Sequence, residues 1–314
     1  MNDFAAAAMM RLIRLGLARQ GLATAGVDAP AVAHVPLKDK RGLAETLLQT
    51  HGPAALLRIG EAIRDAPNEP TLIALALARD PFDLVARWQR LERFIHSRHR
   101  TRILARDDSR LVLRHVALAP HPPPRPAEDL LIFGLLAALI EYVGAEDVRA
   151  RIAGEAAWRR HRGIWTGGAY PNDVSRWEFA WASVSRTEPA PEHRRIGNDW
   201  AAAARAALAA DPGRGWTLRH LADTLGISSR SLQRRLKAEA TSFSLLMAEA
   251  RLAAAATLLG TSDRSAAEIG YACGFADQPH FTREFKRHTA LTPTAFRAQF
   301  ALARRPASFA SAAS

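Results

Sequence analysis

The feature that most constrains the fold is a helical pattern that occurs twice in the last third of the chain. Residues 217–237 and 265–286 each contain a capping residue, apolar residues at helical spacing, a glycine and a second helical run. The two glycines, Gly226 and Gly274, lie 48 positions apart. Because glycine tolerates a positive φ angle at a helix end, each copy is predicted to form two short helices joined by a sharp turn.

In the first copy, Thr217 and Ser228 are expected to cap the two helices, since hydroxyl side chains accept hydrogen bonds from free backbone N–H groups. Leu232 and Leu236 lie four residues apart on the second helix, so both should face inward. The residues left facing outward on that helix are Ser229, Arg230, Gln233 and Arg234.

The second copy repeats these assignments with a turn that is one residue longer. Ser265 is the expected cap, with Glu268 three residues later as in a capping box. The correspondences along the second helix are Phe281 with Leu232, Phe285 with Leu236, Thr282 with Gln233 and Arg283 with Arg234.

The small residues Ala222 and Gly270, four positions before each turn glycine, would allow the paired helices to approach closely. A continuous helical stretch, 242–259, connects the two copies. A helical bundle with arginine on its solvated face is the plain alternative. Two copies with matched inward and outward positions favour a pair of helix-turn-helix units instead.

This region resembles the DNA-binding domain of the AraC/XylS family of bacterial transcriptional regulators. The resemblance rests on ISSRSLQRRLKAEATSF, on the Arg251–Ala253 stretch and on IGYACGFADQPHFTREFKRHTALTPTAFR, and it covers residues 198–300. Ala240 and Ala290 depart from the family pattern, which commonly has glycine at both positions. These departures concern turn geometry more than DNA contact.

The resemblance implies that the second helix of each copy enters the major groove of double-stranded DNA, in successive turns about 34 Å apart. Arginine can bind guanine and glutamine can bind adenine there. The reading positions carried over from the family are Ser229, Arg230, Gln233, Arg234, Gln278, His280, Thr282, Arg283 and Lys286. Base contact is expected for Arg234 and Arg283 and phosphate contact for Ser229 and Lys286, while plain solvation stays open for each.

Residues 1–184 are expected to form an α+β domain. Helices are predicted over 9–25, 41–64, 71–79, 81–97 and 128–142. A hairpin is predicted over 102–105 and 110–117, and further strands over 148–152, 164–166 and 174–184. The polar segment 185–197, with two prolines, is the expected linker to an all-α domain over 198–302, followed by a flexible tail, 303–314.

The N-terminal domain resembles, more loosely, the effector domain of one AraC subgroup, often labelled arabinose-binding-like. The resemblance rests on RLIRLGLARQGL, VPLKDKRGLAETLLQTHGPAALLRIGEAI and DPFDLVARWQRLERFIHSRHR, and the label implies no sugar ligand. Such a domain implies an unknown small-molecule effector, a homodimer or both, and contact with RNA polymerase. A closed apolar pocket would favour ligand sensing, whereas a flat apolar surface would favour oligomerisation alone.

Composition agrees with a nucleic-acid partner and points away from catalysis. The formal charge of +12 favours a polyanion, although the charge is spread along the chain. No phosphate-binding loop, dinucleotide fingerprint or serine-hydrolase elbow occurs, so no cofactor and no enzymatic activity are expected. An alkyl-transfer DNA-repair enzyme needs an exposed reactive thiolate, but the single cysteine, Cys273, is expected to be buried.

Two further features are interpreted conservatively. His96 and His99 could share a metal, but their arginine neighbours favour a solvated basic helix end and no metal site. The apolar run Leu130–Ile140 is shorter than the ~20 residues of a membrane span. A cytoplasmic, nucleoid-associated activator without membrane contact is therefore expected.

Overall fold

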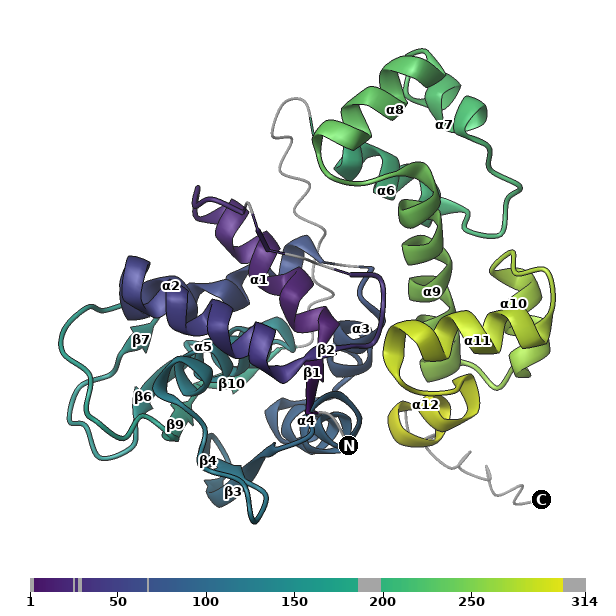
Figure 1. Ribbon diagram of the computed structural model, residues 1–314. Coiled ribbons are helices and arrows are strands. Elements are labelled where there is room, and N and C mark those ends of the chain that lie inside the picture. Colours follow the sequence, from purple (N-terminus) through teal and green to yellow (C-terminus); the bar gives the residue numbers. More distant parts are fainter. Residues whose placement is uncertain (1–2, 25, 28–29, 67, 186–198, 302–314) are drawn as a thin grey trace, which may run out of the picture.

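The computed structural model describes residues 3–24, 26–27, 30–66, 68–185 and 199–301. Within these, a part with mixed helix and sheet precedes an all-helical part (Figure 1), which agrees with the expected fold classes. Except for Ser185, the predicted linker 185–197 lies outside the described residues, as does the predicted tail. The domain boundaries therefore remain predictions.

Each helix predicted in the N-terminal part has a counterpart, but the one predicted over 9–25 ends at Arg19, and residues 20–24 are not helical. These helices are α1 (Ala7–Arg19), α2 (Leu37–Leu57), the 3-10 helix η1 (Arg58–Asp65), α3 (Pro70–Ala76), α4 (Pro81–Ile95) and α5 (Pro126–Tyr142). The single helix predicted over 41–64 is wrong in its second half. Gly52 has a φ of 73° and kinks α2 before Pro53, and the chain then continues as a 3-10 helix.

Helix α5 lies at the centre of the N-terminal part. Residues 127–140 are all buried, so the apolar run Leu130–Ile140 belongs to a core helix. Glycines bring neighbouring backbones against it: a Cβ placed on Gly134 would lie 2.6 Å from Leu57 Cα, and one placed on Gly60 would lie 2.6 Å from the Gly134 carbonyl oxygen. Helix α5 therefore packs directly on the end of α2 and on η1.

A six-stranded antiparallel sheet covers one side of α5. In spatial order it contains β3 (His99–Asp107), β4 (Arg110–Ala117), β9 (Arg176–Ala180), β6 (Arg149–Ile152), β7 (Arg160–His161) and β8 (Ile164–Trp165). Trp177 and Phe179 of β9 pack against Phe133 of α5, at ring distances of 5.8 and 5.5 Å. The predicted β3–β4 hairpin is confirmed.

The single strand predicted over 174–184 is wrong, because this stretch divides into β9 and a second strand that belongs to another sheet. The pairing of two small sheets was also not predicted. One pairs β1 (Phe4–Ala6) with β2 (His34–Pro36), and the other pairs β5 (Ala145–Glu146) with β10 (Ser183–Val184). Strands of two or three residues are too short to show the alternation that identifies a strand in sequence.

The C-terminal part is helical throughout its described residues. Its helices are α6 (Trp200–Ala210), α7 (Leu218–Thr224), α8 (Ser229–Ala238), α9 (Phe243–Thr261), α10 (Ala266–Ala272), α11 (Gln278–Thr289) and α12 (Pro293–Phe300). By length and composition alone α9 is apolar enough to cross a membrane, but 50% of that stretch is buried inside the molecule. It packs on helices from both parts of the chain.

Two separate cores meet along α9. The smaller core joins α6, α7 and α8 to the first half of α9, including Leu246 and Ala250. The larger core joins the N-terminal part to the second half of α9 and to α10, α11 and α12. Figure 1 shows the two groups of helices gathered at opposite ends of α9.

Hydrogen bonds also tie the N-terminal part to the last helices. Arg87 on α4 is buried and donates from Nη1 to the carbonyl oxygen of Phe300 on α12, at 2.7 Å. Arg287 on α11 donates to the carbonyl oxygen of Ala31, at 2.6 Å. The second helix pair is thus anchored to the N-terminal part.

Candidate nucleic-acid interface

The turns in the two helix pairs, α7–α8 and α10–α11, have the same backbone hydrogen bonds. The N–H of Ile227 donates to Ala222 O at 3.0 Å, and the N–H of Phe275 donates to Gly270 O at 2.9 Å. The preceding glycines, Gly226 and Gly274, have φ angles of 69° and 79°. This is the Schellman ending of a helix, so the predicted sharp turns are confirmed.

A second constraint acts on the turn at Gly274. A Cβ there would lie 3.1 Å from Nε of Arg251, whose side chain extends from α9 beneath the turn. Gly274 is therefore required both by its positive φ and by the space that Arg251 occupies. Arg251 had entered the resemblance, but its contact with the turn could not be seen in the sequence.

The predicted caps are confirmed. Thr217 accepts from His220 N, Ser228 accepts from Ser231 N, and Ser265 forms a capping box with Glu268. The cap of α11, Asp277, was not singled out. Its carboxylate accepts from His280 N at 2.6 Å, and the signal was present as an aspartate before Gln-Pro, because proline is favoured in a first helical turn.

The inward residues hold each pair together as expected. Leu232, Leu236, Phe281 and Phe285 have at most 1% of their surface exposed. Ala222 is fully buried. A Cβ on Gly270 would lie 3.2 Å from Cβ of Phe281, so α10 and α11 pack at close to the shortest possible distance.

None of the nine predicted reading residues is buried. Arg230, Gln233, Arg234, Gln278, Arg283 and Lys286 are exposed, and Ser229, His280 and Thr282 are half-buried. The guanidinium groups of Arg234 and Arg283 form no ion pair with any described residue. Helices α8 and α11 therefore present free hydrogen-bond donors to solvent, although their assignment to DNA contacts stays a prediction.

Cys273 lies beneath the second turn and is 1% exposed, as predicted. Loss of hydration raises the pKa of its thiol to about 11, and Arg251 only partly opposes this effect. A nucleophilic cysteine needs the opposite shift. The geometry therefore gives no support to alkyl-transfer chemistry at this residue.

His96 and His99 do not form the solvated helix end that the sequence predicts. His99 is 1% exposed and stacks on His96 at 4.7 Å, so the prediction of a solvated helix end is wrong. The basic residues around His99 did not reveal that β3 carries it beneath α5. Burial lowers the pKa of His99 to about 3.

Possible ligand atoms of His96, His99 and Glu128 lie within 4.8 Å of one another. Lys40 Nζ is 3.3 Å from His96 Nε2 and 3.4 Å from Glu128 Oε1. The buried side chain of Lys40 therefore occupies the space between these ligand atoms, and its burial lowers the pKa of its amino group. His96 Nδ1 also accepts from two backbone N–H groups, which leaves the proton of a neutral imidazole on Nε2.

Residues 221–299 match the family of helix-turn-helix domains. The regulator RipA of Corynebacterium glutamicum is 37% identical over 111 residues, which cover 35% of this chain and 32% of RipA. The transcriptional activator CsvR of Escherichia coli is 30% identical over 92 residues, which cover 29% of this chain and 34% of CsvR. These matches show that the last third of the chain is similar to the helix-turn-helix domains of bacterial transcription regulators.

A solved structure of an AraC-type transcriptional regulator from Chromobacterium violaceum covers 32% of this chain, with 33% identity and a TM-score of 0.31. The chain spans about a third of the length of the curated relatives it matches. The names of both curated relatives describe regulators of transcription rather than enzymes.

Proposed function

We propose that this chain is a sequence-specific DNA-binding transcriptional regulator in which α8 and α11 read two windows of one duplex. The repeated helix pair supports this proposal most strongly: both copies share turn hydrogen bonds, caps and inward residues. The second copy lies within the region that matches the helix-turn-helix family, and the first copy begins just before that region and extends into it.

The chemistry of the outward residues suits base reading. An arginine side chain without an ion-pair partner can make two parallel hydrogen bonds to guanine, and glutamine can do the same with adenine. Arg234 and Arg283 occupy equivalent places on α8 and α11. Ser229 and Lys286 are proposed to contact phosphate groups, which position the protein without selecting sequence.

The proposal is tested by selecting duplexes from a random pool with the purified full chain. We expect one enriched sequence with two conserved blocks about 10–10.5 base pairs apart, centre to centre. Enrichment of no sequence, or of a single block only, would contradict a pair of reading helices.

Substitution then assigns the blocks to their helices. Arg234→Ala and Arg283→Ala should each weaken binding to the selected duplex by about 1–3 kcal/mol and relax the base preference at one position. The matched control is Arg79→Ala, which removes a 61% exposed arginine that belongs to neither helix. Equal weakening on random DNA would identify phosphate contacts instead. Binding should also weaken steeply as salt rises.

The remaining functional assignments are part of the same proposal. The activator role is supported by the name of CsvR, a transcriptional activator. Contact with RNA polymerase and a homodimeric state are proposed, as is a cytoplasmic, nucleoid-associated location. Transcription with purified polymerase and sedimentation of the full chain test the first two.

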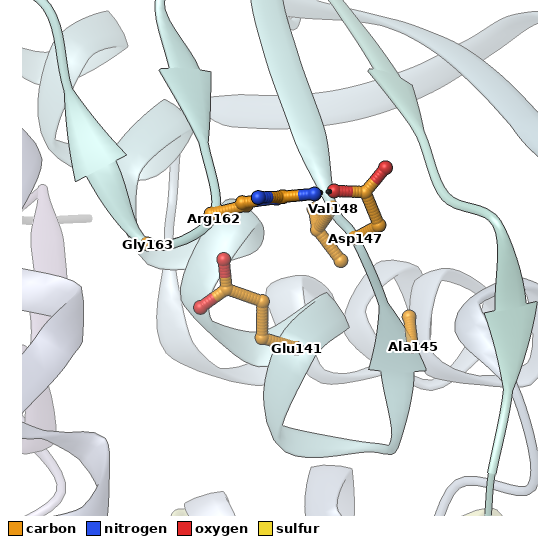
Figure 2. Close-up of a pocket in the computed structure, with 6 residues that line it drawn as sticks. All are labelled: Glu141, Ala145, Asp147, Val148, Arg162 and Gly163. Carbon is orange, nitrogen blue, oxygen red and sulfur yellow. Dashed lines mark ion pairs between the residues drawn. The ribbon is translucent and has the colours of Figure 1, made fainter.

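Effector control is proposed to act through surface hollows rather than through a closed apolar pocket. The apolar face of α5 is packed by its neighbours. Two surface hollows, of about 360 and 230 Å³, lie beside its C-terminal end instead. In the larger one, Arg162 and Asp147 face each other at 3.6 Å near Glu141 (Figure 2). A purely oligomerising N-terminal part is the alternative, and effector binding at these hollows would exclude it.

A further inference from the structure

We propose that the smaller hollow, between η1, the C-terminal end of α5 and the β7–β8 hairpin, binds a small organic monocarboxylate. As an effector site this inference rests on the proposed function. The hollow has a volume of about 230 Å³. It is lined by three arginines, Arg19, Arg64 and Arg160, by two glutamates, Glu61 and Glu141, and by apolar surface from Ile63, Ala138 and Tyr142.

Arg160 is the anchor of this site. Its side chain is only 3% exposed, and Nε and Nη2 donate to the two carboxylate oxygens of Glu141 at 2.9 and 2.8 Å. The guanidinium also lies over the ring of Trp165, at 5.1 Å. These contacts hold the group rigidly, so little entropy is lost when it binds a further acceptor.

One nitrogen of Arg160 still lacks a hydrogen-bond partner. Nη1 is buried and unsatisfied, and its nearest carboxylate oxygen, Glu61 Oε1, is 3.6 Å away, beyond hydrogen-bond distance. Buried donors are satisfied in most proteins, and an exception calls for a physical explanation. A carboxylate in the hollow would accept from this nitrogen.

Of the charged groups around the hollow, one positive group has no negative partner among the described residues. Arg19 pairs with Asp65 at 2.9 Å, and Glu61 pairs with Arg58 at 3.5 Å. Arg160 pairs with Glu141 at 2.8 Å and also with Glu61 at 3.6 Å. Arg64 is the lining guanidinium that forms no ion pair with a described residue, and it lies over the ring of Tyr142 at 5.8 Å. A single negative charge on the ligand would balance it.

The volume of the hollow and the residues around it restrict the choice of ligand further. Drug-sized ligands occupy pockets of about 300–1,000 Å³, so this hollow suits a smaller molecule with a compact apolar body against Tyr142. The neighbouring larger hollow shares Glu141 and Gly163. Its wall carries Asp147, whose carboxylate already pairs with His161 and Arg162, so it offers no free cation to an anion.

A structural connection runs from the hollow to the second helix pair. Helix α1 contributes Arg19 to the hollow, and two turns earlier it carries Arg11, which pairs with Glu69 at 2.7 Å. Arg11 also donates to the carbonyl oxygens of Pro30 and Val32, and Arg287 of α11 donates to that of Ala31 between them. A ligand that shifts α1 would therefore act on the same segment that holds α11.

The test uses the full chain and three probes, acetate, butyrate and benzoate, each compared with its neutral amide at constant ionic strength. Calorimetric titration should show saturable binding of at least one carboxylate and at least tenfold weaker binding of its amide, because a hydrogen bond to a charged group is lost. Equal binding of acid and amide, or no binding of any carboxylate, would overturn the site.

Substitution locates the binding. Arg64→Gln should weaken it about tenfold or more, while Arg79→Gln, at an exposed arginine outside the hollow, should not. Arg64 is exposed, so the variant should fold, and circular dichroism checks this. Arg160→Lys, which keeps the charge but removes the planar fork, should also weaken binding. Unchanged affinity for the carboxylate in both Arg64→Gln and Arg160→Lys would refute the assignment of binding to this hollow.

DNA binding separates this inference from the proposed function. Selective DNA binding without carboxylate binding would overturn the site and leave the regulator intact. Carboxylate binding by a chain that selects no DNA sequence would support the site and contradict the regulator. Carboxylate binding that leaves the affinity for the selected duplex unchanged would refute the effector role.

Discussion

At the scale of single residues, the two departures from the family pattern carry a conformational cost. Ala240 and Ala290 have φ angles of 53° and 66°, in the left-handed region. Ala290 ends α11, and Ala240 follows the end of α8. A Cβ in this conformation crowds the following carbonyl oxygen, whereas glycine adopts it freely.

Ala290→Gly should therefore raise the free energy of unfolding by about 1 kcal/mol, because the relieved strain of about 1–2 kcal/mol exceeds the extra freedom of glycine in the unfolded chain. Urea unfolding measures the change. Ala206→Gly, at an exposed and regular helical position of α6, should have the opposite sign. Destabilisation by both variants would show that Ala290 is unstrained.

Buried histidines predict the pH dependence of stability. Loss of hydration lowers the pKa of His99 and His115 to about 3, and that of His288 to about 4. The unfolded chain protonates these groups near pH 6.5, so their stabilising contribution is present above that pH and is lost progressively as the pH falls. Burial raises the pKa of Asp129 to about 8, so its contribution is lost as the pH rises from about 4 to 8.

The free energy of unfolding should thus be largest near pH 6.5 and fall toward pH 5, by about 2 kcal/mol for each net proton. Urea midpoints at pH 5, 6.5 and 8 measure this. Asp129→Asn should remove the decline in the free energy of unfolding between pH 6.5 and 8. Greater stability at pH 5 than at pH 6.5 would show that the histidines are protonated in the folded protein.

At the scale of elements, backbone contact through glycine positions α5. Gly60 and Gly134 bring η1 and α5 together, and Gly16 brings α1 against Ile59 of η1. No side chain larger than hydrogen fits at these crossings. The arrangement of α1, η1 and α5 also forms one wall of the proposed carboxylate site.

Gly134→Ala should destabilise the protein by about 3 kcal/mol, because its Cβ would overlap the Leu57 backbone and force α5 away from α2. The control is Gly42→Ala on α2, where a Cβ meets no atom within 4 Å, and where alanine should stabilise the helix by about 1 kcal/mol. Thermal unfolding distinguishes the two, and a neutral Gly134→Ala would contradict the close packing.

At the scale of the whole molecule, the boundary between cores does not coincide with the boundary between the two parts of the chain. Helices α10, α11 and α12 share a core with the N-terminal part, whereas α6, α7 and α8 share one only with the start of α9. The two proposed reading helices therefore belong to different packing units. Through the cores of the described residues, a change in the N-terminal part reaches α11 directly and α8 by way of α9.

Hydrogen exchange should show this division. Amides of α7 and α8 should exchange faster than those of α11, because their smaller core can open without disturbing the larger one. Replacing Arg87, which bonds to Phe300, with leucine should speed exchange in α12 and leave α8 unchanged. Equal acceleration in both helices would indicate a single cooperative unit.

Local interactions explain what sequence reasoning could reach. Caps such as Thr217 and Ser265, the glycine turns and the inward phenylalanines of α11 depend on residues a few positions apart, so their spacing alone predicts them. The β3–β4 hairpin follows from alternation around a short turn. Outward positions such as Arg234 and Arg283 follow from the same helical periodicity.

Only the tertiary structure decided how distant segments meet. The burial of His99, the space that Arg251 occupies beneath Gly274 and the unsatisfied nitrogen of Arg160 all depend on residues far apart in the chain. The division of the cores within α9 likewise depends on which surfaces pack on each half of one largely apolar helix. Periodicity states that a face is buried, but it does not name the partner, because hydrophobic burial is non-directional.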